Sequence, residues 1–533
     1  MRKMKLKKLL TGLLILAMAF QMIGCGGSKE AADAPAAETE ETAEETAEDV
    51  TLVWYYSGNG MQSDTKMVQD AFNEKLHEFE GMEHVNVVLN TFVYEDYAQG
   101  VALAQSAGEQ MDIMQTFFLD FATEVSNGSL LPLNDMLANH SALKNELDQW
   151  VWDLGSVNGN IYIVPCLQRA DNEFYFTAPK EYVDNYGDAE KFRAVFGNPD
   201  STIEDYAALL EEWIVNVQAG EGTGKYLTPL AFFYAQTSNS NRGVMEAFDV
   251  LSKSFVLKSS STTVGNIYTD ETFKRACEIT ADWYEKGYVF SDIASVTLND
   301  YIRANMMNEE AFIYCISNGI GSEELQTEKF STSYNFDCYA FPIATEKYVA
   351  NVWAAGGNGI TSSCEHPEEA MRLLEIINTA EGEELYNMLI YGIEDVHYTK
   401  IDATHIETLD YSNEEGDATT SFAGKKWLLG NTNYAWINQG GSDVIKQAGI
   451  ELNESDDLKA SKLCGFIADS DPVSTEIDQV NAITSEYVNT LQYGVMGADW
   501  EATYNEFIEA LDTAGYQTVI DEFQSQVDEF LAK

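Results

Sequence analysis

Aromatic and polar side chains gather at the ends of three β-strands predicted in the N-terminal part of the sequence. They are Tyr55, Tyr56, Tyr94, Asp96 and Phe117. In a parallel sheet the carboxyl ends of the strands lie at one edge, where α/β domains hold ligands. Aromatic rings cover flat C–H surfaces, whereas carboxylates and amides hydrogen-bond to hydroxyl groups. We therefore expect these residues to contact a polyhydroxylated small molecule.

A second group of aromatic and amide side chains occurs between residues 427 and 439. It comprises Trp427, Asn431, Asn433, Tyr434, Trp436, Asn438 and Gln439. The same two kinds of group are combined here, so Tyr434 and Trp436 are added to the expected ligand contacts.

Sequence motifs for covalent catalysis, metal binding or cofactor binding are absent. There is no Gly-x-Ser-x-Gly nucleophile elbow, no phosphate-binding glycine loop and no EF-hand loop, and no two histidines are spaced four apart. Asp and Glu are so abundant that a carboxylate pair suited to glycoside hydrolysis would arise by chance. The sequence indicates a binding protein without catalytic residues, metal or cofactor, and leaves a surface glycoside hydrolase as the alternative.

The N-terminus predicts a signal peptide over residues 1–24. A basic start precedes the apolar run from Leu9 to Ile23, which is short for a membrane span of roughly 20 residues. The following Gly24-Cys25 resembles a bacterial lipobox, in which the cysteine sulfur is acylated. We expect lipid on Cys25, a disordered acidic tether over residues 25–50, and anchoring at the extracellular face of the cell membrane.

Strands and helices alternate after the tether. Thr51 to Tyr56 and Val85 to Val93 are rich in β-branched and aromatic residues, and Met111 to Met114 is predicted as a short buried strand. Between them, Met67 to Phe79 and Tyr97 to Ala107 have apolar residues at helical spacing. This alternation predicts a parallel α/β sheet.

The remaining pattern predicts further elements in both halves of the chain. Asn158-Gly159 favours a hairpin turn that ends at Pro165, and Pro367 is suited to the first turn of a helix. Other predicted elements are mainly helices over residues 170–300, strands at Tyr334–Phe341 and Gly356–Ile360, and two long C-terminal helices after Pro472.

Charge and length restrict the function. The 533 residues include 31 Lys and Arg against 87 Asp and Glu, which gives a net charge of −56. Such a chain lacks the basic footprint of a nucleic-acid-binding protein and is unsuited to docking on anionic lipid. Its field repels anions and tolerates neutral or cationic ligands. The length suggests two or three domains.

Six cysteines remain besides Cys25, and none forms a Cys-x-x-Cys pair. Most lie in apolar stretches, so we expect buried free thiols rather than disulfides or a zinc site.

These segments, in this order, resemble the extracellular solute-binding proteins of bacterial ABC importers, in the carbohydrate-type group. The resemblance is carried by Trp54-Tyr55-Tyr56, Ser106 to Met114, Gly128 to Leu137, the Asn158-Gly159 hairpin, the strand ending at Pro342 and the helix that begins at His366-Pro367. Tyr391 to Tyr398 and Gly465 to Glu476 resemble a Gram-positive subgroup with a C-terminal domain of unassigned function. Asp395 departs from that subgroup, which more often has Gly there.

The resemblance implies a two-lobe periplasmic-binding-protein-like (type II) α/β fold with a hinge and extra C-terminal helices. The expected N-lobe covers residues 51–167 and about 305–345, and the expected C-lobe covers residues 168–304 and about 346–533. Up to three crossings are expected, near residues 165–170, 300–310 and 340–350. They would bring Gln168, Arg169, Asp171, Trp353 and Asn358 to the cleft.

The implied function is the solute-binding component of an ABC importer. We expect a monomer that captures a neutral oligosaccharide and delivers it to permease subunits in the membrane, without nucleic acid. A receptor for peptides or cationic solutes is a further alternative, because the acidic field favours positive charge at the cleft.

Overall fold

The computed structural model describes most of the chain after the predicted tether. The described residues are 49–170, 173–228, 248–252, 254–295, 311–344, 348–349, 356–409, 411–412, 418–419 and 421–532. The predicted signal peptide and Cys25 lie outside these ranges, as do Asp171 and Trp353. Within the described ranges, none of the helices combines the length and apolar character needed to span a membrane.

The first lobe is built on a five-stranded sheet with the order β2-β1-β3-β13-β6. Its strands are β1 (Val50–Gly58), β2 (Val85–Val93), β3 (Ile113–Gln115), β13 (Gly357–Ile360) and β6 (Val164–Pro165). β1 pairs in parallel with β2 and β3, whereas β13 runs antiparallel to β3 and β6. The predicted parallel strand–helix unit is therefore confirmed.

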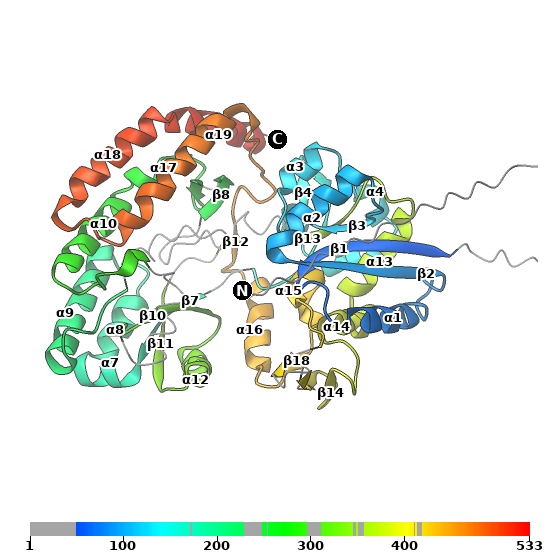
Figure 1. Cartoon of the computed structure of the whole chain (residues 1–533), viewed down its shortest axis with the longest axis horizontal. Helices are drawn as coiled ribbons and strands as arrows, with labels where there is room; N and C mark the ends of the chain where they lie inside the picture. The colour runs from blue at the N-terminus through cyan, green and yellow to red at the C-terminus, as the bar shows by residue number, and fades with distance from the viewer. Residues whose placement is uncertain are drawn as a thin grey trace, which may run out of the picture. The chain divides into compact units, whose positions relative to one another are not determined.

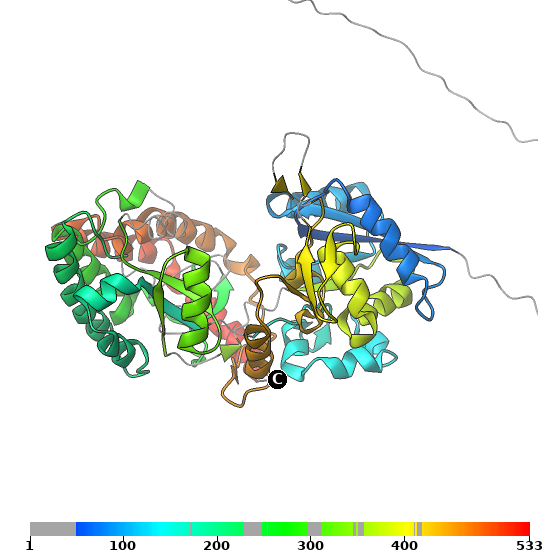
Figure 2. The same ribbon diagram turned by 90° about the horizontal axis from the view of Figure 1, so that it is seen from below.

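Helices cover both faces of this sheet because successive side chains of β1 point to opposite sides. On one face, Leu52 and Trp54 pack in a core with α1 (Thr65–Leu76), α13 (Pro367–Asn378) and α14 (Glu383–Tyr391). On the other face, Tyr55 packs in a second core with α2 (Tyr94–Ala107) and α3 (Phe121–Ser126). Figures 1 and 2 show α1 and α14 side by side on one face.

Short elements complete the first lobe. They are α4 (Asn134–Leu137), α5 (Ser141–Glu146), α6 (Gln149–Leu154), β4 (Ser156–Val157), β5 (Asn160–Ile161), η5 (Ala380–Gly382), β14 (Tyr398–Lys400), β15 (His405–Thr408), β16 (Tyr411–Ser412), β17 (Ala418–Thr419), α15 (Lys426–Leu429), η6 (Thr432–Tyr434), β18 (Ile437–Asn438) and α16 (Asp443–Asn453). Asn158 and Gly159 both have positive φ, 52° and 81°, which confirms the predicted hairpin turn between β4 and β5.

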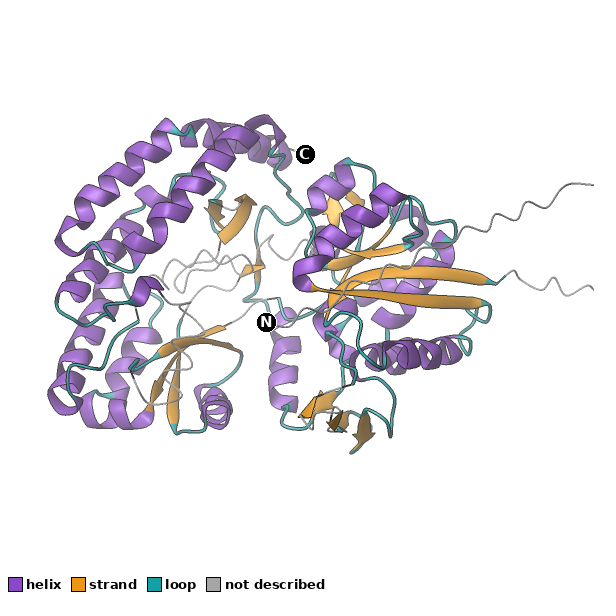
Figure 3. Ribbon diagram, in the orientation of Figure 1, coloured by secondary structure: helices purple, strands orange, loops and turns teal. Residues whose placement is uncertain are grey.

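The second lobe contains a three-stranded antiparallel sheet with the order β10-β7-β11. Its strands are β10 (Cys315–Gly319), β7 (Glu173–Pro179) and β11 (Cys338–Pro342). Phe176 of β7 contacts rings of α8 (Ala189–Phe196) and α9 (Ile203–Glu221), whereas Tyr175 contacts Phe330 of α12 (Glu323–Tyr334). Figure 3 shows these strands between helices. The lobe also includes α7 (Lys180–Tyr186), α10 (Glu271–Glu285) and η3 (Ile293–Ser295).

The strand pairing corrects the predicted lobe boundaries. β10 and β11 fall within residues 305–345, which were expected in the N-lobe, yet both pair with β7 of the second lobe. β13 falls within residues 346–533, which were expected in the C-lobe, yet it joins the first sheet. Composition and periodicity identify a strand but do not reveal its long-range partner, so these assignments were wrong.

The chain crosses between the lobes after β6 and again between β11 and β13, close to the crossings predicted near 165–170 and 340–350. The elements on either side of 300–310 belong to the second lobe. The third connection follows α16 instead. There β19 (Lys459–Ala460) pairs in parallel with β12 (Tyr348–Val349), so two of the connections hydrogen-bond to each other.

The C-terminal region contains three long helices where the sequence predicted two. They are α17 (Ser474–Gln492), α18 (Trp500–Thr513) and α19 (Tyr516–Leu531), and they pack with α10 and the hairpin of β8 (Phe248–Ser252) and β9 (Phe255–Lys258) (Figure 1). Gly515, with φ 86°, separates α18 from α19. The short 3₁₀ turns here are η2 (Ile267–Thr269), η7 (Asp471–Val473) and η8 (Gly497–Asp499).

The six cysteines in the described ranges are free thiols. Cys166, Cys277, Cys315 and Cys338 are buried, and Cys364 and Cys464 are half-buried. The prediction of free thiols is confirmed, and four of the six are buried as expected.

Candidate functional site

A pocket of about 660 Å³ lies beside the first crossing between the lobes. Gln168 and Arg169 of that crossing form part of its wall, and Lys329 of α12 is contributed by the second lobe. The rest comes from Tyr391 of α14, from Lys426 and Trp427 of α15, and from residues between 432 and 450. Elements far apart in the sequence therefore build one cavity.

The segment that enters the pocket is fixed by side chains of α14. Asn387 accepts a hydrogen bond from the backbone N–H of Trp436 (2.7 Å) and donates one to the carbonyl of Tyr434 (2.8 Å). Tyr391 donates to the carbonyl of Trp436 (2.8 Å). These bonds satisfy backbone groups that no strand or helix pairs, so the loop has a defined course.

Trp436, a predicted ligand contact, forms part of the pocket wall, but much of its indole is engaged by protein. Its Nε1 donates to Glu383 (2.7 Å), and its ring meets the ring of Tyr398 edge-on at 5.7 Å between centroids. The Lys400 ammonium lies 4.6 Å from the centre of the indole. Tyr434 donates its hydroxyl to Glu146 and does not line the pocket.

Four half-buried aromatic residues meet next to the pocket. The Trp427 ring lies 4.9 Å from that of Phe117 and 6.2 Å from that of Tyr94, and Phe118 is 4.9 Å from both Tyr94 and Phe117. Burial, followed by the charge of Glu95, raises the pKa of Tyr94. Trp427 belongs both to this group and to the pocket wall, so it joins the two predicted sets of aromatic residues.

Gln168 and Arg169, both predicted ligand contacts, line the pocket, and the end of α16 fixes the chain there. Asn453 donates to the carbonyl of Gln168 (3.1 Å) and accepts from the backbone N–H of Ala170 (2.7 Å). The side chain of Asp96 is exposed on α2 and does not line the pocket. Asp171 and Trp353, also predicted as contacts, lie outside the described residues.

Three predicted contacts lie in the interior instead. Tyr55 stacks on Phe92 at 5.8 Å, and Tyr56 packs against Trp54 at 5.4 Å. Asn358 has no exposed surface. It accepts from Trp54 Nε1 (3.0 Å) and donates to the carbonyl of Leu428 (3.3 Å). α15 contacts both β1 and β13, so the ends of these strands are covered by protein.

Comparison with known proteins assigns the family. The family model for bacterial extracellular solute-binding proteins matches residues 70–392, which is more than half of the chain. The chain is a bacterial extracellular solute-binding protein. A second match, over residues 462–532, is to a domain of unknown function (DUF3502), and it covers the C-terminal helices. The family assigned from the sequence is confirmed.

Individual relatives agree with this assignment. A carbohydrate ABC transporter substrate-binding protein of Streptococcus pneumoniae is 24% identical over 442 residues, covering 82% of this chain and 82% of the relative. The crystal structure of the N-glycan transport solute binding protein (NgtS) from S. pneumoniae has a TM-score of 0.70 at 20% identity, covering 91% of this chain and 99% of that one.

The same S. pneumoniae protein in complex with Man1GlcNAc gives a TM-score of 0.61 at 21% identity, covering 91% of this chain and 100% of that one. These likenesses confirm the two-lobe fold.

The pocket of this solute-binding protein contains basic residues that the sequence did not single out. Lys329, Lys426 and Lys446 line it together with Arg169. Burial, and then the charge of Arg169, lower the pKa of Lys329 and of Lys426. Burial also lowers the pKa of Lys446, against the opposing charge of Glu383. Isolated lysines have no characteristic spacing, so no sequence pattern marked them.

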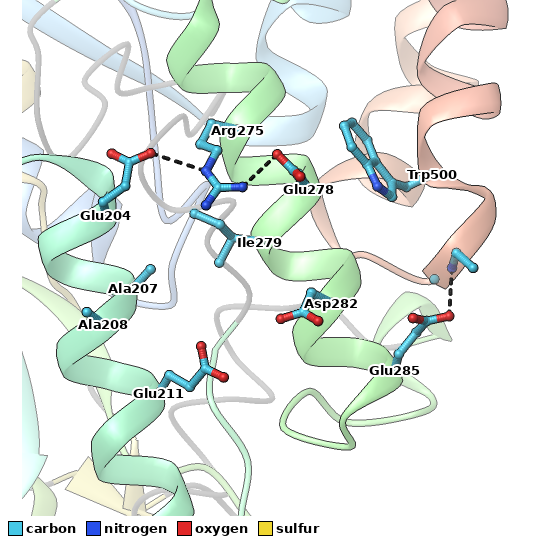
Figure 4. Close-up of a pocket in the computed structure, with 12 residues that line it drawn as sticks. Glu204, Ala207, Ala208, Glu211, Arg275, Glu278, Ile279, Asp282, Glu285 and Trp500 are labelled. Atoms are coloured by element: carbon cyan, nitrogen blue, oxygen red, sulfur yellow. Dashed lines mark hydrogen bonds and ion pairs between the residues drawn. The ribbon is translucent and has the colours of Figure 1, made fainter.

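The solute-binding protein also has a groove of about 480 Å³ between α9 and α10 (Figure 4). Arg275 crosses it and pairs with Glu204 (3.2 Å) and Glu278 (2.6 Å), and Glu285 accepts from the backbone N–H of Ala498 (2.8 Å). Glu211 and Asp282 both pair with Lys286. Arg275 and Lys286 therefore pair with most of the carboxylates that line the groove. No metal-binding group of His, Cys, Asp or Glu occurs within the described ranges.

Proposed function

We propose that this protein is the receptor of an ABC importer, that it captures an oligosaccharide in the pocket at the lobe crossing, and that it delivers the sugar unchanged to a permease. The observation that carries the proposal is the lining of the pocket. Trp427 provides aromatic surface, and Gln168, Asn433, Asn438 and Gln439 provide amides. Sugars combine flat C–H faces with rims of hydroxyls, which these two kinds of group match.

The relatives support a carbohydrate ligand. One is named as a carbohydrate ABC transporter substrate-binding protein, and another is seen in complex with Man1GlcNAc. A receptor of this kind works from the outer face of the membrane. We include in the proposal a monomer that is lipid-anchored through Cys25.

The absence of catalytic carboxylates supports transport over hydrolysis. A glycoside hydrolase places two carboxyl groups on either side of the scissile bond. Among the described residues that line this pocket there is neither Asp nor Glu. The proposed receptor therefore binds and releases its ligand without cleaving it.

The proposal predicts saturable binding without turnover. Titration calorimetry of the purified protein against a panel of oligosaccharides should give at least one ligand with about micromolar affinity or better, which corresponds to roughly −8 kcal/mol. Chromatography of the same mixtures should return the sugar intact. Release of shorter products would move the protein to the hydrolases, and binding of peptides alone would refute the carbohydrate assignment.

A further inference from the structure

The described residues that line the pocket have the opposite charge to the chain as a whole. The chain contains 87 acidic and 31 basic residues, yet the described residues that line the pocket include Arg169, Lys329, Lys426 and Lys446 and no acidic residue. With nearly three acidic residues for each basic one, a random stretch of surface would show the reverse. The local field at the pocket therefore differs from the field that the net charge suggests.

The four cations come from separate parts of the fold. Arg169 belongs to the first crossing, Lys329 to α12, Lys426 to α15 and Lys446 to α16. They are not one basic stripe along a helix, because each is carried by a different element. Tertiary structure brings them to one cavity.

The three lysines are not neutralised by salt bridges in the described part of the chain. Lys446 donates to the carbonyl of Ala435 (2.8 Å), and Lys329 donates to the side-chain oxygen of Gln326 (3.4 Å). Elsewhere the basic residues commonly meet carboxylates: Lys191 pairs with Glu212 (2.8 Å) and Arg372 with Glu381 (2.6 Å). Two carboxylates outside the pocket lining act on the charge of Lys446: Glu383, which accepts from Trp436, and Asp443, which pairs with His405 (3.0 Å).

Gathering the three lysines in a partly desolvated cavity is unfavourable unless a counter-charge arrives. The direction of the lysine pKa shifts agrees, since burial and the neighbouring Arg169 make the charged forms of Lys329 and Lys426 harder to hold. An anion placed among these groups would remove their repulsion and form charge-assisted hydrogen bonds.

We propose that the ligand is an acidic oligosaccharide, whose negatively charged substituent lies among Arg169, Lys329, Lys426 and Lys446 while its sugar rings contact Trp427. This inference rests on the proposed function and names the ligand class of the same pocket. It replaces the neutral ligand expected from net charge, because a bound group responds to the charges that line its site more strongly than to distant, screened ones.

The test compares oligosaccharides in matched pairs. Each pair consists of a uronic-acid oligosaccharide and its carboxyl-reduced, neutral counterpart, titrated calorimetrically into the purified protein. The acidic member of the best-binding pair should bind about tenfold more tightly or better, and the advantage should shrink as salt is raised. Equal or tighter binding of the neutral members overturns the inference but leaves the receptor role intact. Failure of every oligosaccharide of either kind to bind overturns both.

Variants separate charge from packing. Lys426→Gln keeps the backbone carbonyl that accepts from Tyr386 and should weaken binding of the acidic member by about tenfold, with less than about a twofold effect on the neutral member. Lys66→Gln, at an exposed position of α1, removes the same charge outside the pocket. It should change the affinity for neither the acidic nor the neutral member. An equal loss for both members in Lys426→Gln would assign the lysine a packing role and contradict the inference.

Discussion

Trp427 is the residue on which the proposed binding site depends most directly. It touches Phe117 and Tyr94 on one side and lines the pocket on the other. Its ring is half-buried, whereas that of Trp436 is 5% exposed and holds a hydrogen bond to Glu383. The two tryptophans should therefore behave differently when they are removed.

Trp427→Ala should weaken oligosaccharide binding by about tenfold or more, because aromatic contacts contribute roughly 0.5–1.5 kcal/mol beyond burial and the apolar area is lost as well. Trp436→Ala should instead lower the free energy of unfolding by about 3–5 kcal/mol, as for other buried tryptophans. Calorimetric titration and urea unfolding of both variants check these outcomes. Unchanged affinity in Trp427→Ala would remove the aromatic group from the binding site.

At this scale the sequence identified residue types better than their surroundings. Among the predicted ligand contacts, Gln168, Arg169 and Trp436 line the pocket. Tyr55 and Asn358 do not, because Tyr55 packs against Phe92 in the core with α2, and Asn358 is covered by α15, which lies far away in the sequence. The lysines were missed for the same physical reason: only the folded chain brings them together.

Glu375 shows how one buried carboxylate joins two elements. It lies on α13 and accepts from His140 Nδ1 (2.9 Å), from Arg372 (2.9 Å) and from the backbone N–H of Leu143 in α5 (3.4 Å). Burial alone would raise the pKa of Glu375, but the hydrogen bonds from His140 and Arg372 outweigh it and hold the pKa below its ordinary value. The charged form therefore stabilises the contact between α5 and α13.

Glu375→Gln should reduce the free energy of unfolding by about 1–3 kcal/mol at neutral pH. A carboxylate whose pKa is lowered by folding contributes stability above its unfolded pKa and loses it as pH falls through the folded value. The difference in the free energy of unfolding between wild type and variant should therefore become smaller as pH is lowered below about 4. Urea unfolding at neutral pH and below about pH 4 measures this difference. Glu74→Gln, at an exposed position of α1, is the control. A gap that does not depend on pH would mean that charge is not the cause.

Elements with strong periodicity were predicted well. The strand at 85–93 agrees residue for residue, and α1, α2 and α13 follow their apolar spacing and their flanking turns. The sequence did not predict which strands pair with each other. Strands were predicted in the regions of β11 and β13 but not at β10, and the partners of all three are set by packing over long sequence distances.

For the whole molecule, the proposed anchor gives a direct prediction. Cys25→Ser removes the sulfur that lipid would occupy, and without acyl chains the protein should move from the membrane fraction to the medium. Fractionation of cells followed by immunoblotting measures this. Cys364→Ser, which changes a half-buried thiol of the folded body, should leave the protein in the membrane fraction. Retention of the Cys25→Ser protein at the membrane would place the anchor elsewhere.

The position of β13 in the first sheet bears on how the chain acquires its structure during synthesis and secretion. β1, β2 and β3 are complete by Gln115, but β3 remains an unpaired edge until Gly357–Ile360 has been made and inserted between β3 and β6. The strands of the second sheet all lie between these two points, so that sheet can close first. An exposed edge invites pairing with other chains, and distant pairing is slow. We therefore expect the nascent N-terminal segment to need a chaperone until residues 357–360 have been made.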